Sequence, residues 1–187
     1  MNFCSHCGAP VRIEVPAGDN RARHVCPSCG AVHYQNPKMV VGCIPEWEDK
    51  ILLCRRAIEP KYGLWTLPAG FMENGETTAE GAARETLEEA GARVQVLNLY
   101  SMISLPDINQ VYLVFRAKLL HLDFAPGEES LEAALFAESE IPWDELAFRT
   151  IGHTLKRYYA DRRGDVGEHG CDETYPLHVG EIFHKPR

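Results

Sequence analysis

Residues 70–92 read "GFMENGETTAEGAARETLEEAGA", and this stretch decides which fold the chain can adopt. Thr77 and Glu80 have the spacing of a capping box, in which each side chain accepts a hydrogen bond from the backbone N–H of the other residue. Gly91 suits the left-handed position at which many helices end. The sequence therefore predicts a helix over residues 77–90.

Three glutamates share one face of that helix. Glu85, Glu88 and Glu89 stand at i, i+3 and i+4, where like charges cost an isolated helix about 0.2–0.5 kcal/mol per pair. Mg²⁺ and Mn²⁺ prefer carboxylate oxygens and are commonly held together with substrate phosphates, so a bound cation would cancel the repulsion. A solvated acidic surface is the alternative, and the spacing alone does not choose between the two.

The other side of the helix is apolar. With 100° per residue, Ala79, Ala83, Leu87 and Ala90 fall together at roughly 120–200° from the first glutamate, and we expect this side to pack on a sheet. Gly81 falls beside the glutamates, where its missing side chain would leave room for a ligand.

The fixed residues of this stretch resemble the Nudix box. The matching positions are Gly70, Glu76, Arg84, Glu85, Glu88, Glu89, Gly91 and Ala92, and Leu87 and Ala90 stand where the box accepts any residue. Thr86 is the one departure, because the box prefers a larger apolar residue there. The preceding "LWTLPAG" (64–70) also resembles the usual entry to the box, and the resemblance extends as strand order over roughly residues 38–160.

This resemblance implies an α/β fold, a Nudix-type α/β/α sandwich with a mixed sheet, that hydrolyses a nucleoside diphosphate linked to another group. It also implies that Glu85, Glu88 and Glu89, with the backbone carbonyl of Ala69, bind catalytic Mg²⁺ or Mn²⁺. Arg84 would orient Glu85.

Further site residues follow from the same resemblance. Glu76 would steady its loop or pair with Arg84. Family members often supply a base for the attacking water from a later loop, where this chain has Glu128, Glu129 and Glu132. We prefer Glu132 because it directly precedes the apolar "AALF", although an exposed loop acid is an equally good interpretation of any one of the three.

The rest of the chain fits a sheet covered on both faces. Apolar runs predict strands over 39–44, 50–56, 93–105, 110–120 and 130–137, and "GLWTLPAGF" (63–71) is expected to form a loop and a strand. A helical region should begin at "ESEIPWDELAF" (138–148), and residues 148–163 have the length and period of a closing helix.

Four of the seven cysteines form a metal pattern. Cys4, Cys7, Cys26 and Cys29 stand in two Cys-x-x-Cys-Gly units separated by 18 residues, which matches the spacing of zinc ribbons. Four thiolates complete a tetrahedron, so the zinc should be structural. We expect two domains, a zinc ribbon over 1–37 and a Nudix domain over 38–187. Cys171, His169, His178 and His184 match no known metal spacing, and a packed or free tail is the preferred interpretation of that segment.

Composition narrows the function. The 187 residues contain no apolar run long enough for a membrane span and no visible secretory signal. The odd cysteine count and the metal pattern favour a reducing, cytoplasmic location. A formal charge of −8 argues against a broad nucleic-acid surface, but it permits a small phosphorylated substrate bound through a cation. A second copy of the chain, in a homodimer, is one of the partners that we consider.

The substrate is less well defined. A zinc ribbon ahead of a Nudix domain resembles the NADH pyrophosphatases, but their "SQPWPFP" stretch is missing from "YSMISLPDINQVYLVFRAKL" (100–119). The segments that follow resemble the ribbon-bearing ADP-ribose/FAD pyrophosphatases. We therefore expect hydrolysis of ADP-ribose or FAD with release of AMP. The alternatives are an NADH pyrophosphatase, an enzyme that removes NAD caps from RNA, and a non-catalytic nucleotide sensor or zinc-ribbon adaptor.

Overall fold

The computed structural model describes residues 1–164 and 178–181. Contacts between Cα atoms divide the chain into two compact units, Met1–Pro37 and Lys38–Arg187. The first unit is a small antiparallel sheet of β1 (Arg12–Glu14), β2 (Arg23–Val25) and β3 (Val32–His33). Each Cys-x-x-Cys turn closes on itself, because the N–H groups of Gly8 and Gly30 donate to the carbonyls of Cys4 and Cys26, both over 2.9 Å.

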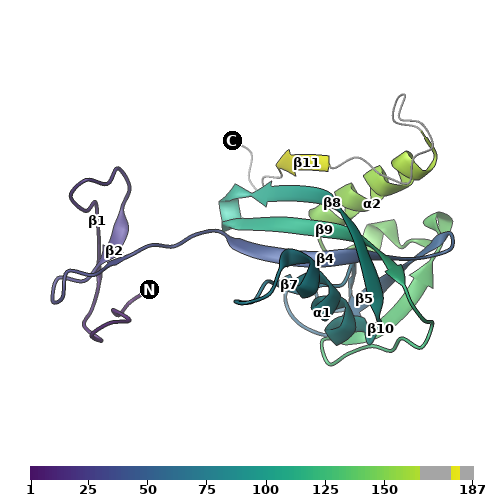
Figure 1. Ribbon diagram of the computed structural model, residues 1–187, viewed down its shortest axis with the longest axis horizontal. Coiled ribbons are helices and arrows are strands. Elements are labelled where there is room, and N and C mark those ends of the chain that lie inside the picture. Colours follow the sequence, from purple (N-terminus) through teal and green to yellow (C-terminus); the bar gives the residue numbers. More distant parts are fainter. Residues whose placement is uncertain (165–177, 182–187) are drawn as a thin grey trace. The chain divides into compact units, whose positions relative to one another are not determined.

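The second unit is built on a mixed sheet (Figure 1). Its strands are β4 (Lys38–Trp47), β5 (Lys50–Arg56), β6 (Trp65–Thr66), β7 (Ala69–Phe71), β8 (Val94–Leu105), β9 (Gln110–Leu119), β10 (Ser130–Phe136) and β11 (His178–Glu181). The sheet order is β10-β5-β4-β9-β8-β11, with β6 on β5 and β7 on β4. The pairs β4–β9 and β8–β11 are parallel and the others are antiparallel. The strands expected from the apolar runs are confirmed.

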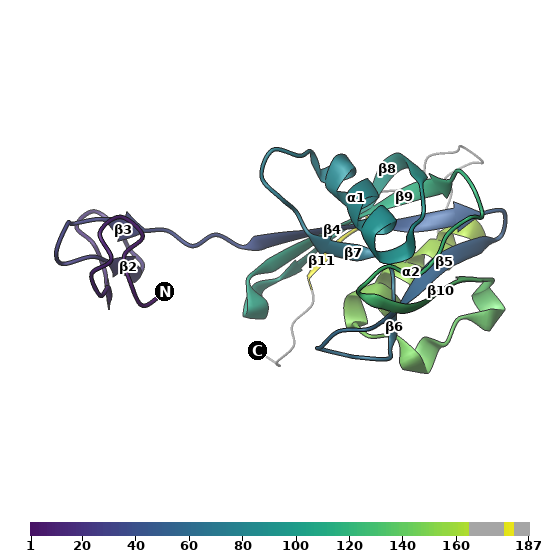
Figure 2. The ribbon, with the colours of Figure 1, turned by 90° about the horizontal axis from the view of Figure 1, so that it is seen from below.

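Two α-helices cover the sheet, α1 (Thr78–Ala90) on one face and α2 (Arg149–Arg162) on the other, as Figure 2 shows. The alternation of β4 explains this division. Val41 and Cys43 pack in a cluster with Ala82 of α1, whereas Ile44 packs in a separate cluster with Leu155 of α2. The predicted α/β/α sandwich is confirmed.

The caps of α1 are also confirmed. Glu80 N–H donates to Thr77 Oγ1 over 3.2 Å, and Thr77 N–H donates to Glu80 Oε2 over 2.8 Å. At the other end Gly91 has a φ of 61°, and its N–H donates to the carbonyl of Leu87. These local bonds fix both ends of the helix that carries the three glutamates.

The prediction for the buried side of α1 was wrong at Leu87, which is 42% exposed. Small and polar residues face the sheet: Ala82 and Thr86, which were not predicted there, are fully buried together with the predicted Ala90. Thr86 tolerates burial because its hydroxyl donates to the carbonyl of Ala82 over 2.8 Å. The helix lies close to the sheet, and the residues that fit there are those with small side chains.

Three short 3₁₀ turns complete the elements, at Pro106–Ile108, Glu138–Glu140 and Trp143–Glu145. The last two stand where the sequence predicted the start of a helical region. Pro142 separates them, and the residue before a proline is driven into an extended conformation, here with a ψ of 128° at Ile141. A continuous helix cannot form across that step.

The C-terminal segment contributes β11, which pairs in parallel with residues 101–104 of β8. This strand was not predicted. Of the histidines and cysteine noted in the tail, His178 lies in β11, while Cys171, His169 and His184 lie outside the described residues. Within residues 1–164 and 178–181, no helix has the length and apolarity needed to cross a bilayer.

Candidate active site and metal centres

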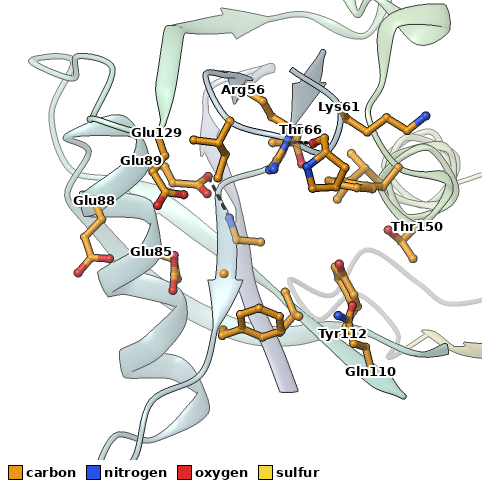
Figure 3. Close-up of a pocket in the computed structure, with 18 of the residues that line it drawn as sticks. Arg56, Lys61, Thr66, Glu85, Glu88, Glu89, Gln110, Tyr112, Glu129 and Thr150 are labelled. Carbon is orange, nitrogen blue, oxygen red and sulfur yellow. Dashed lines mark hydrogen bonds between the residues drawn. The ribbon is translucent and has the colours of Figure 1, made fainter. Parts of the chain in front are cut away.

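The second unit contains a cavity of about 940 Å³ between α1, the sheet and the start of α2 (Figure 3). Carboxylates form one wall. They come from α1 and from the loop before β10, and they are Glu85, Glu88, Glu89, Glu128 and Glu129. Ala69, Gly70 and Arg84 line the same cavity. The structure thus brings most of the predicted site residues to one place.

Arg84 organises this wall. Its guanidinium donates to Glu76 over 2.8 Å, to Glu85 over 2.8 Å and to Glu88 over 3.0 Å. It also donates to the carbonyl of Phe71 at the end of β7, over 3.2 Å. The hydrogen bonds from Arg84 lower the pKa of Glu76 to about 2. Arg84 therefore ties the box helix to β7 and to the loop before the helix.

Glu85 and Glu89 are the buried acids of this wall. Each is 8% exposed, and Glu89 Oε2 accepts a hydrogen bond from the backbone N–H of Ala69 over 3.3 Å. Burial raises the pKa of Glu89 to about 8 and raises that of Glu85 as well. Glu88 reaches toward solvent, with 59% of its side chain exposed. A cation bound here would favour the charged forms of the buried pair.

Two glycines make this packing possible. A Cβ at Gly70 would lie 2.2 Å from Glu85 Oε2, so any side chain there would displace the carboxylate. A Cβ at Gly81 would lie 2.6 Å from Glu76 Oε1 and 2.9 Å from Val41 Cγ2. The space beside Gly81 is thus filled by Glu76 and the sheet. The expectation that it leaves room for a ligand was wrong.

The loop before β10 is held against the end of α1 at Gly127. The N–H of Gly127 donates to the carbonyl of Glu89 over 2.9 Å. A Cβ at Gly127 would lie 1.7 Å from the carbonyl oxygen of Glu88, so only glycine allows this approach. The contact places the next two residues, Glu128 and Glu129, at the cavity.

Glu132 lies elsewhere, and the geometry does not support our preference for it as the base. It stands on β10, outside the lining of the cavity. Its Oε2 is 3.9 Å from Arg55 Nη1 on the neighbouring strand β5. Side chains alternate along a strand, so closeness in sequence to the apolar "AALF" does not bring this carboxylate to the cavity.

The basic and aromatic part of the lining was missed by the sequence analysis. It includes Arg56, Lys61, Tyr112, Phe148 and Thr150. Figure 3 shows Lys61, Tyr112 and Thr150 on the side of the cavity away from Glu85, Glu88 and Glu89. The guanidinium of Arg56 lies 5.2 Å from the ring centre of Phe148. These residues come from β5, the loop after it, β9 and the start of α2. No local spacing connects them, and only the sheet order brings them together.

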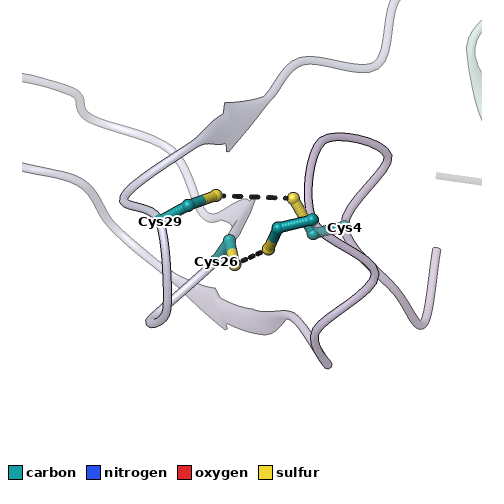
Figure 4. Close-up of side chains that lie close together, drawn as sticks. Cys4, Cys26 and Cys29 are labelled. Carbon is teal, nitrogen blue, oxygen red and sulfur yellow. Dashed lines mark hydrogen bonds between the residues drawn. The ribbon is translucent and has the colours of Figure 1, made fainter.

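The four cysteine sulfurs of the first unit lie together, all within 4.8 Å of one another (Figure 4). The Cys4–Cys29 and Cys7–Cys26 sulfur distances are 3.7 and 3.5 Å. A tetrahedral zinc with bonds of about 2.3 Å needs edges of about 3.8 Å, so the quartet fits zinc. His33 Nε2, which the sequence analysis did not single out, lies 3.3 Å from Cys4 Sγ.

The cluster of cysteine sulfurs and the cluster of carboxylates differ in how closely their ligand atoms approach one another. Among the described residues, the four cysteines are the only set of three or more His, Cys, Asp or Glu side chains whose ligand atoms all lie within 4.8 Å. The carboxylates of α1 have separate partners, because Glu85 and Glu88 bond to Arg84 and Glu89 bonds to the N–H of Ala69. They form an open array on a cavity wall, which is how Mg²⁺ sites commonly leave positions for water and substrate phosphates.

Family comparisons agree with this geometry. A model described as "Nudix N-terminal" matches residues 2–35, and the NUDIX domain model matches residues 36–160. This chain belongs to the Nudix family. A crystal structure of a Nudix hydrolase from Nitrosomonas europaea is similar to it, with a TM-score of 0.91, 57% identity, and coverage of 98% of this chain and 99% of that one. The resemblance seen in the sequence is confirmed.

Two relatives carry more specific names. An NAD-capped RNA hydrolase, NudC, from Chromobacterium violaceum is 33% identical over 167 residues, which cover 88% of this chain and 60% of that protein. An ADP-ribose pyrophosphatase from Methanocaldococcus jannaschii is 34% identical over 119 residues, covering 62% of this chain and 69% of that protein. The Nudix chain described here thus spans about three fifths of the length of the NudC relative.

Proposed function

We propose that this Nudix protein hydrolyses the pyrophosphate bond of ADP-ribose or FAD and releases AMP. The observation that carries the proposal is the acidic wall formed by Glu85, Glu88 and Glu89 on a cavity of about 940 Å³. Small-molecule sites commonly measure about 300–1,000 Å³, so the cavity suits a ligand as large as a dinucleotide.

The donor set fits a divalent cation. Glu85, Glu88, Glu89 and the backbone carbonyl of Ala69 would hold Mg²⁺ or Mn²⁺, because carboxylate and carbonyl oxygens are the ligands that these ions prefer. The burial of Glu89 supports this assignment, since its charge is costly there without a cation. When bound, the ion polarises the phosphoryl group and makes a bound water more acidic.

The chain's own residues then position the reaction. Arg84 orients Glu85 through the 2.8 Å contact, and Glu76 holds Arg84 in turn. We propose Glu129, in place of Glu132, as the acceptor of the proton from the attacking water, with Glu128 as the neighbour to compare. Both line the cavity, and a general base must be within reach of the proton that it removes.

The choice of substrate rests on the sequence and on one relative. The "SQPWPFP" stretch of NADH pyrophosphatases is missing, and one relative is named an ADP-ribose pyrophosphatase. The test is kcat/KM for ADP-ribose, FAD and NADH with Mg²⁺ and with Mn²⁺, with AMP measured as product. A value for NADH well above both of the others would reverse the choice.

The second candidate is hydrolysis of NADH or of NAD caps on RNA. One observation favours it: the similarity to the NudC relative covers 88% of this chain. Release of the cap from NAD-capped RNA at a rate above that for ADP-ribose would establish this candidate. Tight binding of all these nucleotides without turnover would instead indicate a sensor.

We further propose that the ribbon zinc is structural, because four thiolates leave no open position for water. Thiolate ligands of this kind persist in a reducing compartment, so we place the protein in the cytoplasm. The homodimer remains a prediction, which light scattering of the full chain would test.

A further inference from the structure

Helix α2 begins at the cavity without a side-chain cap. Its N-cap residue is Phe148, whose ring offers no hydrogen-bond acceptor. The N–H groups of Ile151 and Gly152 both reach the carbonyl of Phe148, over 3.1 and 3.3 Å. The N–H groups that come before these two in the first turn precede every acceptor inside the helix, and the helix dipole adds partial positive charge at this end. The start of α2 therefore presents donors to the cavity.

Thr150 in that first turn gives a second, independent observation. It is 4% exposed, it lines the cavity, and its Oγ1 has no hydrogen-bond partner within residues 1–164 and 178–181. The buried hydroxyls of Thr86 and Thr154 are both partnered, by the carbonyl of Ala82 over 2.8 Å and by Ser101 Oγ at 3.4 Å. A buried hydroxyl without a partner lowers stability, so its presence at a cavity points to a ligand.

Basic side chains line the same cavity as this hydroxyl. They are those of Arg56, Lys61 and Arg149. Arg56 is held in place by its Nε bond to the carbonyl of Pro60, over 3.0 Å, and by its position over the ring of Phe148. Figure 3 shows Lys61 and Thr150 across the cavity from Glu85, Glu88 and Glu89 of α1. Backbone donors together with cationic side chains favour an anion rather than a neutral hydroxyl.

We propose that the first turn of α2, with Thr150 and Arg56, binds a phosphate group of the substrate that is not hydrolysed. The inference rests on the proposed function, which places the scissile pyrophosphate at the carboxylates of α1. Phosphates bind well at helix N-termini. The substrate class is then an ADP-ribose derivative that carries an additional phosphate remote from the pyrophosphate.

The test compares substrates that differ by one phosphate. The probes are ADP-ribose, 2′-phospho-ADP-ribose and ADP-ribose 1″-phosphate, and the proteins are the full-length chain and its Thr150→Val, Thr150→Ser and Thr154→Val variants. We expect one phosphorylated probe to exceed ADP-ribose in kcat/KM by about tenfold, mainly through KM, as for one hydrogen bond to a charged group. Thr150→Val should remove this preference, whereas Thr150→Ser and the control Thr154→Val should keep it.

A stability measurement separates ligand binding from a folding defect. Valine matches threonine in shape and removes the unpartnered hydroxyl, so Thr150→Val without ligand should melt at the same or a higher temperature than the unchanged protein. Equal kcat/KM for the three probes in the unchanged protein would overturn the inference. An equal loss on all three probes in Thr150→Val would do the same.

The proposed function can be wrong while the phosphate site is right, and the same probes distinguish the two cases. If none of the probes is hydrolysed, the proposed function is wrong, and calorimetry of the same probes then decides the phosphate site. Tighter binding of a phosphorylated probe to the unchanged protein, lost in Thr150→Val and restored in Thr150→Ser, would support the site. Affinities that do not depend on the additional phosphate would contradict it.

Discussion

The two candidate metal sites differ in how much they contribute to the buried cores of their units. In residues 1–37 the buried side chains are Cys4, Val25 and Cys26, and two of these three are zinc-ligand candidates. The second unit has three clusters of buried apolar residues, and its carboxylates lie at the margin of a finished core. In the ribbon the metal takes the place of a core, whereas in the Nudix unit it would be added to one.

This difference has a physical basis in size. A module of fewer than 40 residues buries too little apolar surface to fold without cross-links or metal. The second unit is large enough to bury both faces of its sheet. Loss of metal should therefore unfold one unit and stop only the chemistry of the other, and each of the following experiments tests one side of that contrast.

The largest effect is expected on turnover. Glu85→Gln removes a proposed metal ligand while keeping the shape of the side chain, so kcat should fall by about 10²–10³, the scale of other losses of transition-state electrostatics. The melting temperature should stay near that of the unchanged protein. Glu132→Gln is the matched control, because Glu132 lies outside the cavity, and it should keep nearly full activity. Near-normal turnover of Glu85→Gln at saturating Mg²⁺ would remove Glu85 from the site.

The next effect concerns the ribbon. Cys4→Ser or Cys26→Ser should abolish tight zinc binding and unfold residues 1–37, because the thiolate bonds supply the folding free energy of such a module. The second unit should remain folded. Zinc content by atomic absorption and amide hydrogen exchange for each unit measure both results. Protection that persists in residues 1–37 without zinc would show that the ribbon has a sufficient core of its own.

A smaller effect is expected at the loop that brings Glu128 and Glu129 to the cavity. Gly127→Ala places a Cβ 1.7 Å from a backbone oxygen of α1, so the loop must move. We expect a loss of about 1–3 kcal/mol in the free energy of unfolding, as for other overpacked sites, and a lower kcat. Urea denaturation and steady-state kinetics test this, with Gly180→Ala as a control because nothing lies within 4 Å of a Cβ there and its φ is outside the left-handed region. Unchanged kcat would argue against a base from this loop.

The smallest effect is a pH dependence of stability without divalent cation. Burial raises the pKa of Glu89 from 4.5 to about 8 in the folded state, so folding favours its protonated form. The stabilising contribution is complete below pH 4.5 and is lost as the pH rises toward 8. The metal-free second unit should therefore become less stable over this range, measured by denaturation at each pH. Added Mg²⁺, or the substitution Glu89→Gln, should reduce the slope, and an unchanged slope in Glu89→Gln would assign it to another group.

The sequence predicted those parts of the structure that depend on neighbours along the chain. The capping box of Thr77 and Glu80, the stop at Gly91 and the spacing of the cysteines are local patterns, and the structure contains each of them in the expected form. The predicted strands could be located for the same reason, because each one corresponds to an apolar run of neighbouring residues. The box helix and the ribbon could thus be located before any tertiary contact was known.

The errors and omissions depend on tertiary packing. Leu87 is exposed because α1 turns Ala82, Thr86 and Ala90 toward the sheet, and the apolar pattern of the helix does not reveal that orientation. Glu132 was preferred on sequence position, but the direction of its side chain depends on the register of β10 against β5. Thr150 and Arg56 meet at one cavity only because α2 and β5 lie beside each other in the folded unit.

The short strand β11 has a consequence for the behaviour of the protein in solution. Without it, one long edge of β8 would offer unpaired backbone groups to other molecules, and such edges promote aggregation. His178–Glu181 pairs with residues 101–104 of that edge, and His178 is fixed by its 2.6 Å contact with Asp161 of α2. A chain that ended after Gly164 would keep the box helix and the cavity but lose this protective strand, and it would be prone to self-association through β8.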